Sequence, residues 1–253
     1  MAFYDLPKPE RAELAARIRR ELQHDLESGG EKYLFLYFAD EDTYIRKAAY
    51  IATGRIYLAE KKLRAKILRQ LEKFFSEEDF KIRQTLINAA GEIGKTDFEA
   101  VQHFFDKGLF DAHHVVRNAV IGSVKKMGQK NPEPVLRWAK KYLHHADKEI
   151  RREICHGIEL RGRTHPQDIL PLLKELQFDT TARVRNTLVH VLGQIAYKKG
   201  CLVTVIAELN RWENRALVND ALEEIIDVHH RYRDFSAMTQ AEARAYIQKH
   251  FGK

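Results

Sequence analysis

The chain of 253 residues has few cysteines and no long apolar run. Cys155 and Cys201 are its only cysteines, and their separation of 46 positions gives neither a CxxC pair nor a disulfide framework. Charged residues interrupt every apolar stretch well before the roughly 20 residues that a membrane helix needs. The N-terminus has no basic segment followed by an apolar core, as a secretory signal would. We therefore expect a soluble, cytoplasmic protein with reduced thiols and no membrane partner.

The sequence also lacks the common signatures of metal and nucleotide sites. There is no HExxH motif and no cysteine cluster, and paired histidines such as His113 and His114 are adjacent, so on a helix they point about 100° apart. The glycines of residues 91–94 lie inside an expected helix rather than after a strand, which excludes a phosphate-binding loop. Cys155 and His156 face different directions for the same geometric reason. We expect no metal, no cofactor and no catalytic residue.

Charge is unevenly distributed along the chain. The 43 Lys and Arg against 36 Asp and Glu give a net charge of +7. Residues 117–200 hold 17 Lys and Arg and 8 Asp and Glu, a net +9, so the remainder carries −2. A local cationic excess favours polyanions through phosphate contacts and counterion release. A solvated basic surface is the alternative explanation.

An aliphatic residue followed by arginine recurs along most of the chain. The copies are Ile45-Arg46, Ile82-Arg83, Val116-Arg117, Ile150-Arg151 and Val184-Arg185, with Val218-Asn219 as a sixth that lacks the arginine. Successive copies are 37 residues apart once and 34 residues apart four times. Apolar residues 3 and 7 positions after each arginine complete one helix face. This period predicts helical hairpins that stack on a continuous core.

The ends of the expected helices carry their own signals. Aspartate stands four residues before three of the arginines, at Asp42, Asp79 and Asp147, where its carboxylate can cap the incoming helix. Small residues such as Gly91 and Gly193 stand near the other end, where they permit close helix approach. We expect one domain over residues 1–253, with a capping helix in 1–30, repeats over about 31–235 and a second capping helix in 236–253. Thr239 and Glu242 form a capping box at the start of that last helix.

The D-x-x-[IV]-R opening of the second helix in each unit, followed by a small residue, resembles the HEAT repeat. Residues 79–83 and 147–151 match it closely, and the resemblance covers about residues 42–233. It implies a curved, right-handed scaffold whose second helices line the concave face. The expected fold is therefore all-α, a right-handed α-solenoid of about six HEAT-like hairpins.

Part of the chain is similar to the bacterial DNA alkylation repair group of HEAT-like glycosylases. The similarity lies in residues 131–152, 162–166 and 184–186. The W-W-D-x-x-D motif of that group ends in its catalytic aspartate, and Arg117 occupies the corresponding position here. A basic groove residue of the group corresponds to Arg151, and a groove tryptophan to His190. The resemblance implies a groove that faces nucleic acid, and Arg117 predicts that the glycosylase activity is absent.

We interpret the repeated arginines as packing residues that pair with turn aspartates between neighbouring units. Positions one and five residues after them project from the adjacent helix face, where polar side chains can hold phosphate oxygens. The candidate nucleic-acid contacts, on this face and along its extension, are Lys47, Asn118, Lys126, Arg151, Arg152, His156, Arg163, Asn186, His190, Gln194, Tyr197, Lys198 and Lys199. Tyr197 is the aromatic contact among them.

The favoured function is a monomeric, non-catalytic binder of a nucleic-acid backbone, with DNA preferred over RNA. Two other classes remain open. The same face fits an acidic protein, which would make the chain a protein-protein interaction scaffold. A divergent alkylpurine DNA glycosylase would need another carboxylate beside an aromatic wall, for which Asp111 and Glu159 are the candidates.

Overall fold

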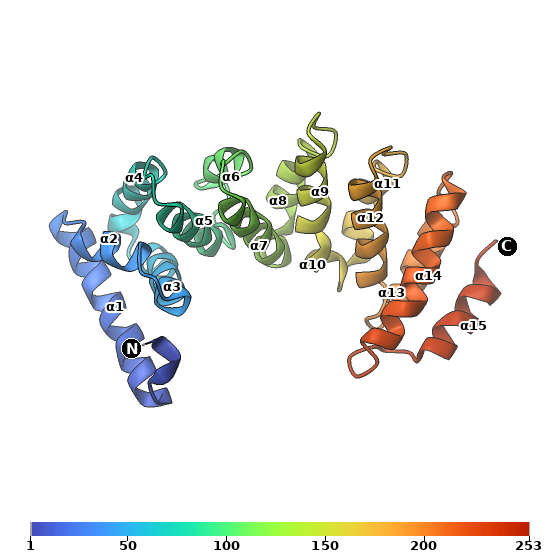
Figure 1. Ribbon diagram of the computed structural model, residues 1–253, viewed down its shortest axis with the longest axis horizontal. Helices are drawn as coiled ribbons and strands as arrows, with labels where there is room; N and C mark the ends of the chain where they lie inside the picture. The colour runs from blue at the N-terminus through green and yellow to red at the C-terminus, as the bar shows by residue number, and fades with distance from the viewer. Residues whose placement is uncertain (1, 253) are drawn as a thin grey trace. The chain divides into compact units, whose positions relative to one another are not determined.

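The computed structural model describes residues 2–252, whose regular secondary structure is all helical, with no strand among them. The chain divides into two compact units, Met1–Asn131 and Pro132–Lys253. Each unit consists of three stacked helical hairpins and one flanking helix (Figure 1). This confirms the predicted α-solenoid of about six repeats. Over the described range, no helix is both long enough and apolar enough to cross a membrane.

The first unit opens with the 3-10 turn η1 (Phe3–Asp5) and the flanking helix α1 (Lys8–Ser28). Its hairpins are α2 (Lys32–Phe38) with α3 (Thr43–Ala59), α4 (Arg64–Phe74) with α5 (Phe80–Gly94), and α6 (Gln102–Gly108) with α7 (His114–Lys130); the 3-10 turn η2 (Lys61–Leu63) precedes α4. Helix α1 packs on α3, α3 on α5, and α5 on α7. The second helices of this unit therefore form one layer.

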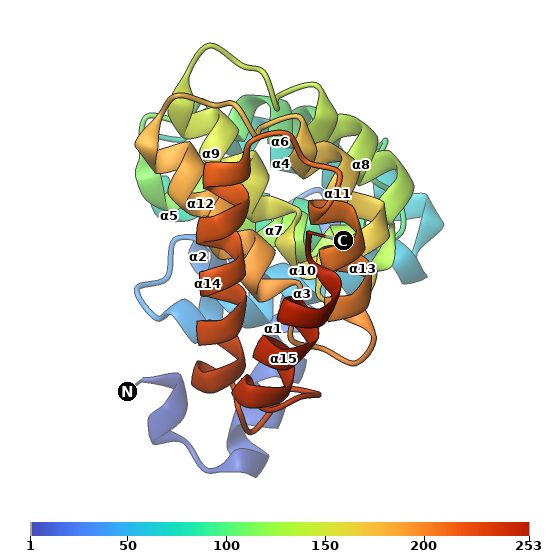
Figure 2. The ribbon, with the colours of Figure 1, turned by 90° about the vertical axis from the view of Figure 1, so that its right-hand side faces the viewer.

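The second unit repeats the arrangement and ends in the flanking helix α15 (Gln240–His250). Its hairpins are α8 (Pro132–Lys140) with α9 (Lys148–Gly157) and α10 (Glu159–Gly162), α11 (Pro166–Lys174) with α12 (Ala182–Gln194), and α13 (Cys201–Leu209) with α14 (Arg215–Arg231). Helix α12 packs between α9 and α14, and Figure 1 shows these three side by side, while in Figure 2 they overlap with α14 in front. The predicted capping box is present, because Thr239 and Glu242 exchange side-chain and backbone hydrogen bonds.

The predicted helix starts and core positions are confirmed. Asp42 caps α3 by accepting a hydrogen bond from a backbone N–H of the first turn, and Asp79 and Asp147 cap α5 and α9 in the same way, with distances of 2.7 to 2.8 Å. Each such cap stabilises its helix by about 1 kcal/mol. The repeat positions of α5 that were assigned to the core, Ile82, Leu86 and Ala90, are fully buried.

Two of the repeated arginines, Arg83 and Arg151, pair with the turn aspartate of the next repeat, as the packing interpretation predicted. Arg83 donates from Nε and Nη2 to the two carboxylate oxygens of Asp111 at 2.8 and 3.1 Å, and Arg151 does the same to Asp179 at 2.6 and 3.2 Å. Each guanidinium also donates to carbonyls of its own preceding turn. Arg151, one of the predicted nucleic-acid contacts, therefore also serves the packing of the fold. Asp111, one of the two candidate catalytic carboxylates, is bound on both oxygens by Arg83.

Candidate functional site

A buried carboxylate lies at the centre of the predicted contacts in the second unit. Glu159, the first residue of α10, is only 1% exposed. Arg163 donates to its Oε1 from Nε at 2.9 Å and from Nη2 at 2.5 Å. The same Nη2 donates to Oε1 of Gln194 at 2.7 Å and so ties α10 to the end of α12. Arg163 thus compensates the charge of Glu159 and holds its Oε1 in one orientation.

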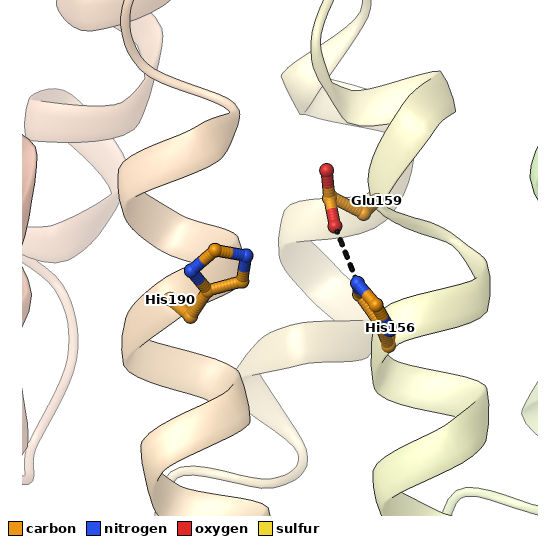
Figure 3. A group of neighbouring side chains, drawn as sticks. All are labelled: His156, Glu159 and His190. Atoms are coloured by element: carbon orange, nitrogen blue, oxygen red, sulfur yellow. Dashed lines mark ion pairs between the residues drawn. The ribbon is translucent and has the colours of Figure 1, made fainter. Parts of the chain in front are cut away.

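Two histidines face the other oxygen of Glu159. His156 Nε2 lies 3.1 Å from Glu159 Oε2. His190 stands on α12 in the next repeat, and one donor atom from each of the three residues lies within 4.8 Å of the others. In Figure 3 the three side chains converge from α9, α10 and α12. Two imidazole nitrogens and a carboxylate oxygen form a donor set that can hold a transition-metal ion.

The burial of His190 favours the neutral form of its ring. Its Nδ1 lies 3.6 Å from Oε1 of Glu224 on α14. Burial lowers the pKa of His190 below its usual value, and the neighbouring carboxylates Glu159 and Glu224 only partly oppose that effect. An imidazole that is neutral at pH 7 has a lone pair available for a ligand.

The arginine predicted to contact phosphate beside this cluster is already paired within the protein. Arg152 donates to Glu149 at 2.9 Å and lies 3.4 Å from a carboxylate oxygen of Glu153. Arg183 pairs with the other oxygen of Glu149 at 2.8 Å. Intramolecular carboxylates therefore compensate much of the positive charge on this face of the second unit, which leaves less of it for an external anion.

Tyr197, the predicted aromatic contact, is buried in the structure. Tyr197 is 4% exposed, and its ring stacks on that of Tyr232 at a centroid distance of 5.3 Å, so it has no free face for a base. The ammonium group of Lys198 lies 4.8 Å from the Tyr197 ring. Among the remaining predicted contacts of this unit, Asn186 and Lys199 are exposed.

The first unit holds three of the predicted contacts. Lys47 on α3 and Asn118 on α7 are exposed. Lys126, also on α7, places its ammonium group 5.9 Å from the centroid of the Tyr50 ring on α3. These three residues lie in the first unit, and the other ten predicted contacts lie in the second.

A hollow of about 430 Å³ lies between α1, α3 and the η1 segment of the first unit. Its lining is mainly alanine and aromatic, with Ile51 among the larger apolar side chains. Three exposed cations, Arg19, Lys47 and Arg55, stand in the lining, and none has an ion pair or hydrogen bond within residues 2–252. The sequence pointed to Lys47 alone. Arg19 lies outside the repeats, and Arg55 is nine residues after Arg46. Neither residue therefore falls at the positions one or five residues after a repeated arginine, from which the contacts were predicted.

Comparisons with known proteins found similarity among solved structures only. No protein-family profile matches it, and no curated protein sequence matches it. A solved structure of a TOG domain of crescerin, described as regulating microtubules in the primary cilium, is similar over 89% of this chain and 91% of that one, with 15% identity and a TM-score of 0.49. A designed armadillo repeat protein in complex with the peptide (KR)4 is similar over 75% of this chain and 96% of that one, with 17% identity and a TM-score of 0.37.

Proposed function

We propose that this protein is a non-catalytic helical-repeat scaffold whose first unit binds an acidic protein segment that carries an apolar side chain. The observation that carries the proposal is the hollow between α1 and α3, where Arg19, Lys47 and Arg55 surround an apolar lining without partners of their own. Cations that are not compensated inside the protein are available to a ligand, whereas paired ones must first be released.

The spacing of the cations suits an extended or helical acidic segment. Lys47 and Arg55 are eight residues apart on α3, which corresponds to about 12 Å along the helix axis. Arg19 faces the same hollow from α1. Carboxylates at two points of a segment can therefore be neutralised while a side chain between them enters the hollow.

A protein segment fits this surface better than a phosphate backbone does. The position of Lys47 is repeated on the next two second helices by Gln84 and Asn118, whose amides can both donate and accept. A peptide backbone offers both N–H and C=O groups, whereas phosphate only accepts. An apolar lining adds burial energy for an aliphatic or aromatic side chain and none for a phosphate.

The test is fluorescence anisotropy of a labelled peptide composed of Asp, Glu and Leu, with a Lys-rich peptide of equal length as the negative probe. We expect the acidic peptide to bind, and Lys47→Glu combined with Arg55→Glu to weaken it at least about tenfold. Lys61→Glu combined with Lys62→Glu makes the same charge change on exposed residues of the same unit outside the hollow, and should have a much smaller effect.

Two outcomes would overturn the proposal. One is equal peptide affinity for the Lys47/Arg55 variant and its control. The other is tight binding of duplex DNA, with log affinity falling steeply with log salt, that the acidic peptide does not displace. That result would favour the nucleic-acid alternative, which is supported by the net charge of +9 in residues 117–200.

A further inference from the structure

The cluster on α9, α10 and α12 has the composition of a metal site rather than of a packing contact. His156 and His190 are 34 residues apart, one repeat period, so they occupy equivalent places on neighbouring second helices. Glu159 Oε2 lies between them, 3.1 Å from His156 Nε2. All three donor atoms lie within 4.8 Å of one another, and Figure 3 shows them turned toward a common point.

The surroundings of Glu159 orient it as a ligand. Arg163 donates two hydrogen bonds to Oε1, at 2.9 and 2.5 Å, and a third to Oε1 of Gln194. This leaves Oε2 as the oxygen that faces the histidines. Ligating carboxylates in metalloproteins are commonly held by such a hydrogen bond on the oxygen that does not face the metal.

His190 is arranged in a comparable way. Glu224 Oε1, on α14, lies 3.6 Å from His190 Nδ1 and also pairs with Arg231. A carboxylate beside one ring nitrogen favours a proton there and directs the other nitrogen toward a metal. The cluster therefore includes, around its three donors, the outer partners that orient metal ligands.

We propose that His156, Glu159 and His190 bind one Zn²⁺ ion, with water completing a tetrahedral coordination. Two imidazole nitrogens and one carboxylate oxygen suit zinc, whereas magnesium and calcium prefer oxygen ligands only. Bonds of about 2.0 to 2.1 Å require the donors to approach one another to roughly 3.4 Å. The His190 side chain is 43% exposed and can rotate to close this gap. The ion would link the fourth repeat to the fifth, independently of the hollow in the first unit.

The experiment uses the full chain after dialysis against EDTA. Isothermal titration with Zn²⁺ should give one ion per chain, and Co²⁺ should produce the visible absorption of a tetrahedral site. His190→Ala, a change at a half-exposed position that the fold tolerates, should abolish the cobalt absorption and weaken zinc binding at least about tenfold. His24→Ala removes an exposed histidine from α1 and should leave both readouts unchanged.

A second variant tests the orienting role of Glu224. Glu224→Gln should weaken zinc binding by about 10-fold or more while the stoichiometry stays at one. The proposal is overturned if the wild-type chain does not bind zinc, or if His190→Ala binds it as tightly as wild type. Equal losses in His190→Ala and His24→Ala would also overturn it, because they would indicate scattered surface histidines as the binding groups.

Discussion

The guanidinium of Arg151 and the carboxylate of Asp179 are joined by two hydrogen bonds, 2.6 Å from Nε and 3.2 Å from Nη2, across the boundary between two repeats. Both side chains are largely buried, with exposed fractions of 15% and 7%. The backbone N–H of Thr181 donates to the same carboxylate at 2.8 Å, so Asp179 also shapes the turn before α12. The pair therefore joins two neighbouring hairpins through residues that are 28 positions apart in sequence.

Removing the carboxylate of this pair should destabilise the second unit. Asp179→Ala leaves a largely buried guanidinium and a backbone N–H without their acceptor, and we expect the free energy of unfolding to fall by about 2 kcal/mol. Urea unfolding followed by circular dichroism measures the change. The control is Glu133→Ala, which breaks an exposed pair with Arg137 and should change stability by less than about 0.5 kcal/mol. Equal effects of the two substitutions would contradict the packing role.

Acid should weaken the arginine-aspartate pairs between repeats. Burial alone would raise the pKa of Asp111 and of Asp179, but hydrogen bonds from Arg83 and Arg151, and from backbone N–H groups, outweigh it and hold both pKa values below the usual range. A depressed carboxyl pKa contributes stability above the unfolded-state value of about 3.9, and this contribution is lost as pH falls through the lower folded value.

The prediction is a decline in the free energy of unfolding below about pH 4, measured by urea unfolding at a series of pH values. Replacing both aspartates by asparagine should lower stability at pH 7 and make the decline toward acid shallower. If the double variant showed the same decline as wild type, other carboxyl groups would be responsible for it.

The periodic features of this chain could be predicted from its sequence, because each recurs at the same place in more than one repeat. The period of 34 residues identified Ile82 and Leu86 as core, and Asp42 and Asp79 as caps, since a local pattern decides which face of a helix is buried and where it begins. The same repetition predicted that the arginines pair with turn aspartates, as Arg83 and Arg151 do.

The candidate sites depend on contacts between helices, and the periodicity of a single helix does not indicate which side chains meet there. The adjacent histidine pairs are visible in the sequence, whereas His156 and His190 meet only because α9 packs on α12. Likewise Arg55 enters the hollow through the approach of α1 to α3. The separation of the two histidines by one full period was the one signal in the sequence that indicated their proximity.

The two cysteines should be inert in the folded protein. Cys155 and Cys201 are free and buried, and burial raises the pKa of both thiols, so little reactive thiolate forms at neutral pH. An aromatic disulfide reagent should therefore label neither thiol quickly in the native protein and both after unfolding in urea. Rapid labelling of one thiol without urea would show that its helix opens locally, and Cys155→Ser or Cys201→Ser would identify which one.

Two glycines of the first unit should respond to alanine in opposite directions. A Cβ atom at Gly91 on α5 would lie 2.5 Å from Ser123 Oγ and 2.7 Å from Ser123 Cβ on α7, so the two packed helices must separate. We expect Gly91→Ala to destabilise by about 1 to 3 kcal/mol. At Gly122, also on α7, no described atom outside its own helix backbone and chain neighbours lies within 4 Å of that position. Gly122→Ala should stabilise by about 0.5 to 1 kcal/mol, because alanine is the better helix former.

Urea unfolding of the two single variants distinguishes helix propensity from helix contact. Propensity alone would make both alanines stabilising, since both glycines lie inside helices. The contact between α5 and α7 makes the alanine substitution destabilising at Gly91 only. Adding Ser123→Gly to Gly91→Ala removes the atoms that the new methyl group meets and should recover part of the loss, although Ser123→Gly on its own weakens α7. A double-mutant cycle without coupling between the two positions would show that the cost at Gly91 comes from somewhere other than Ser123.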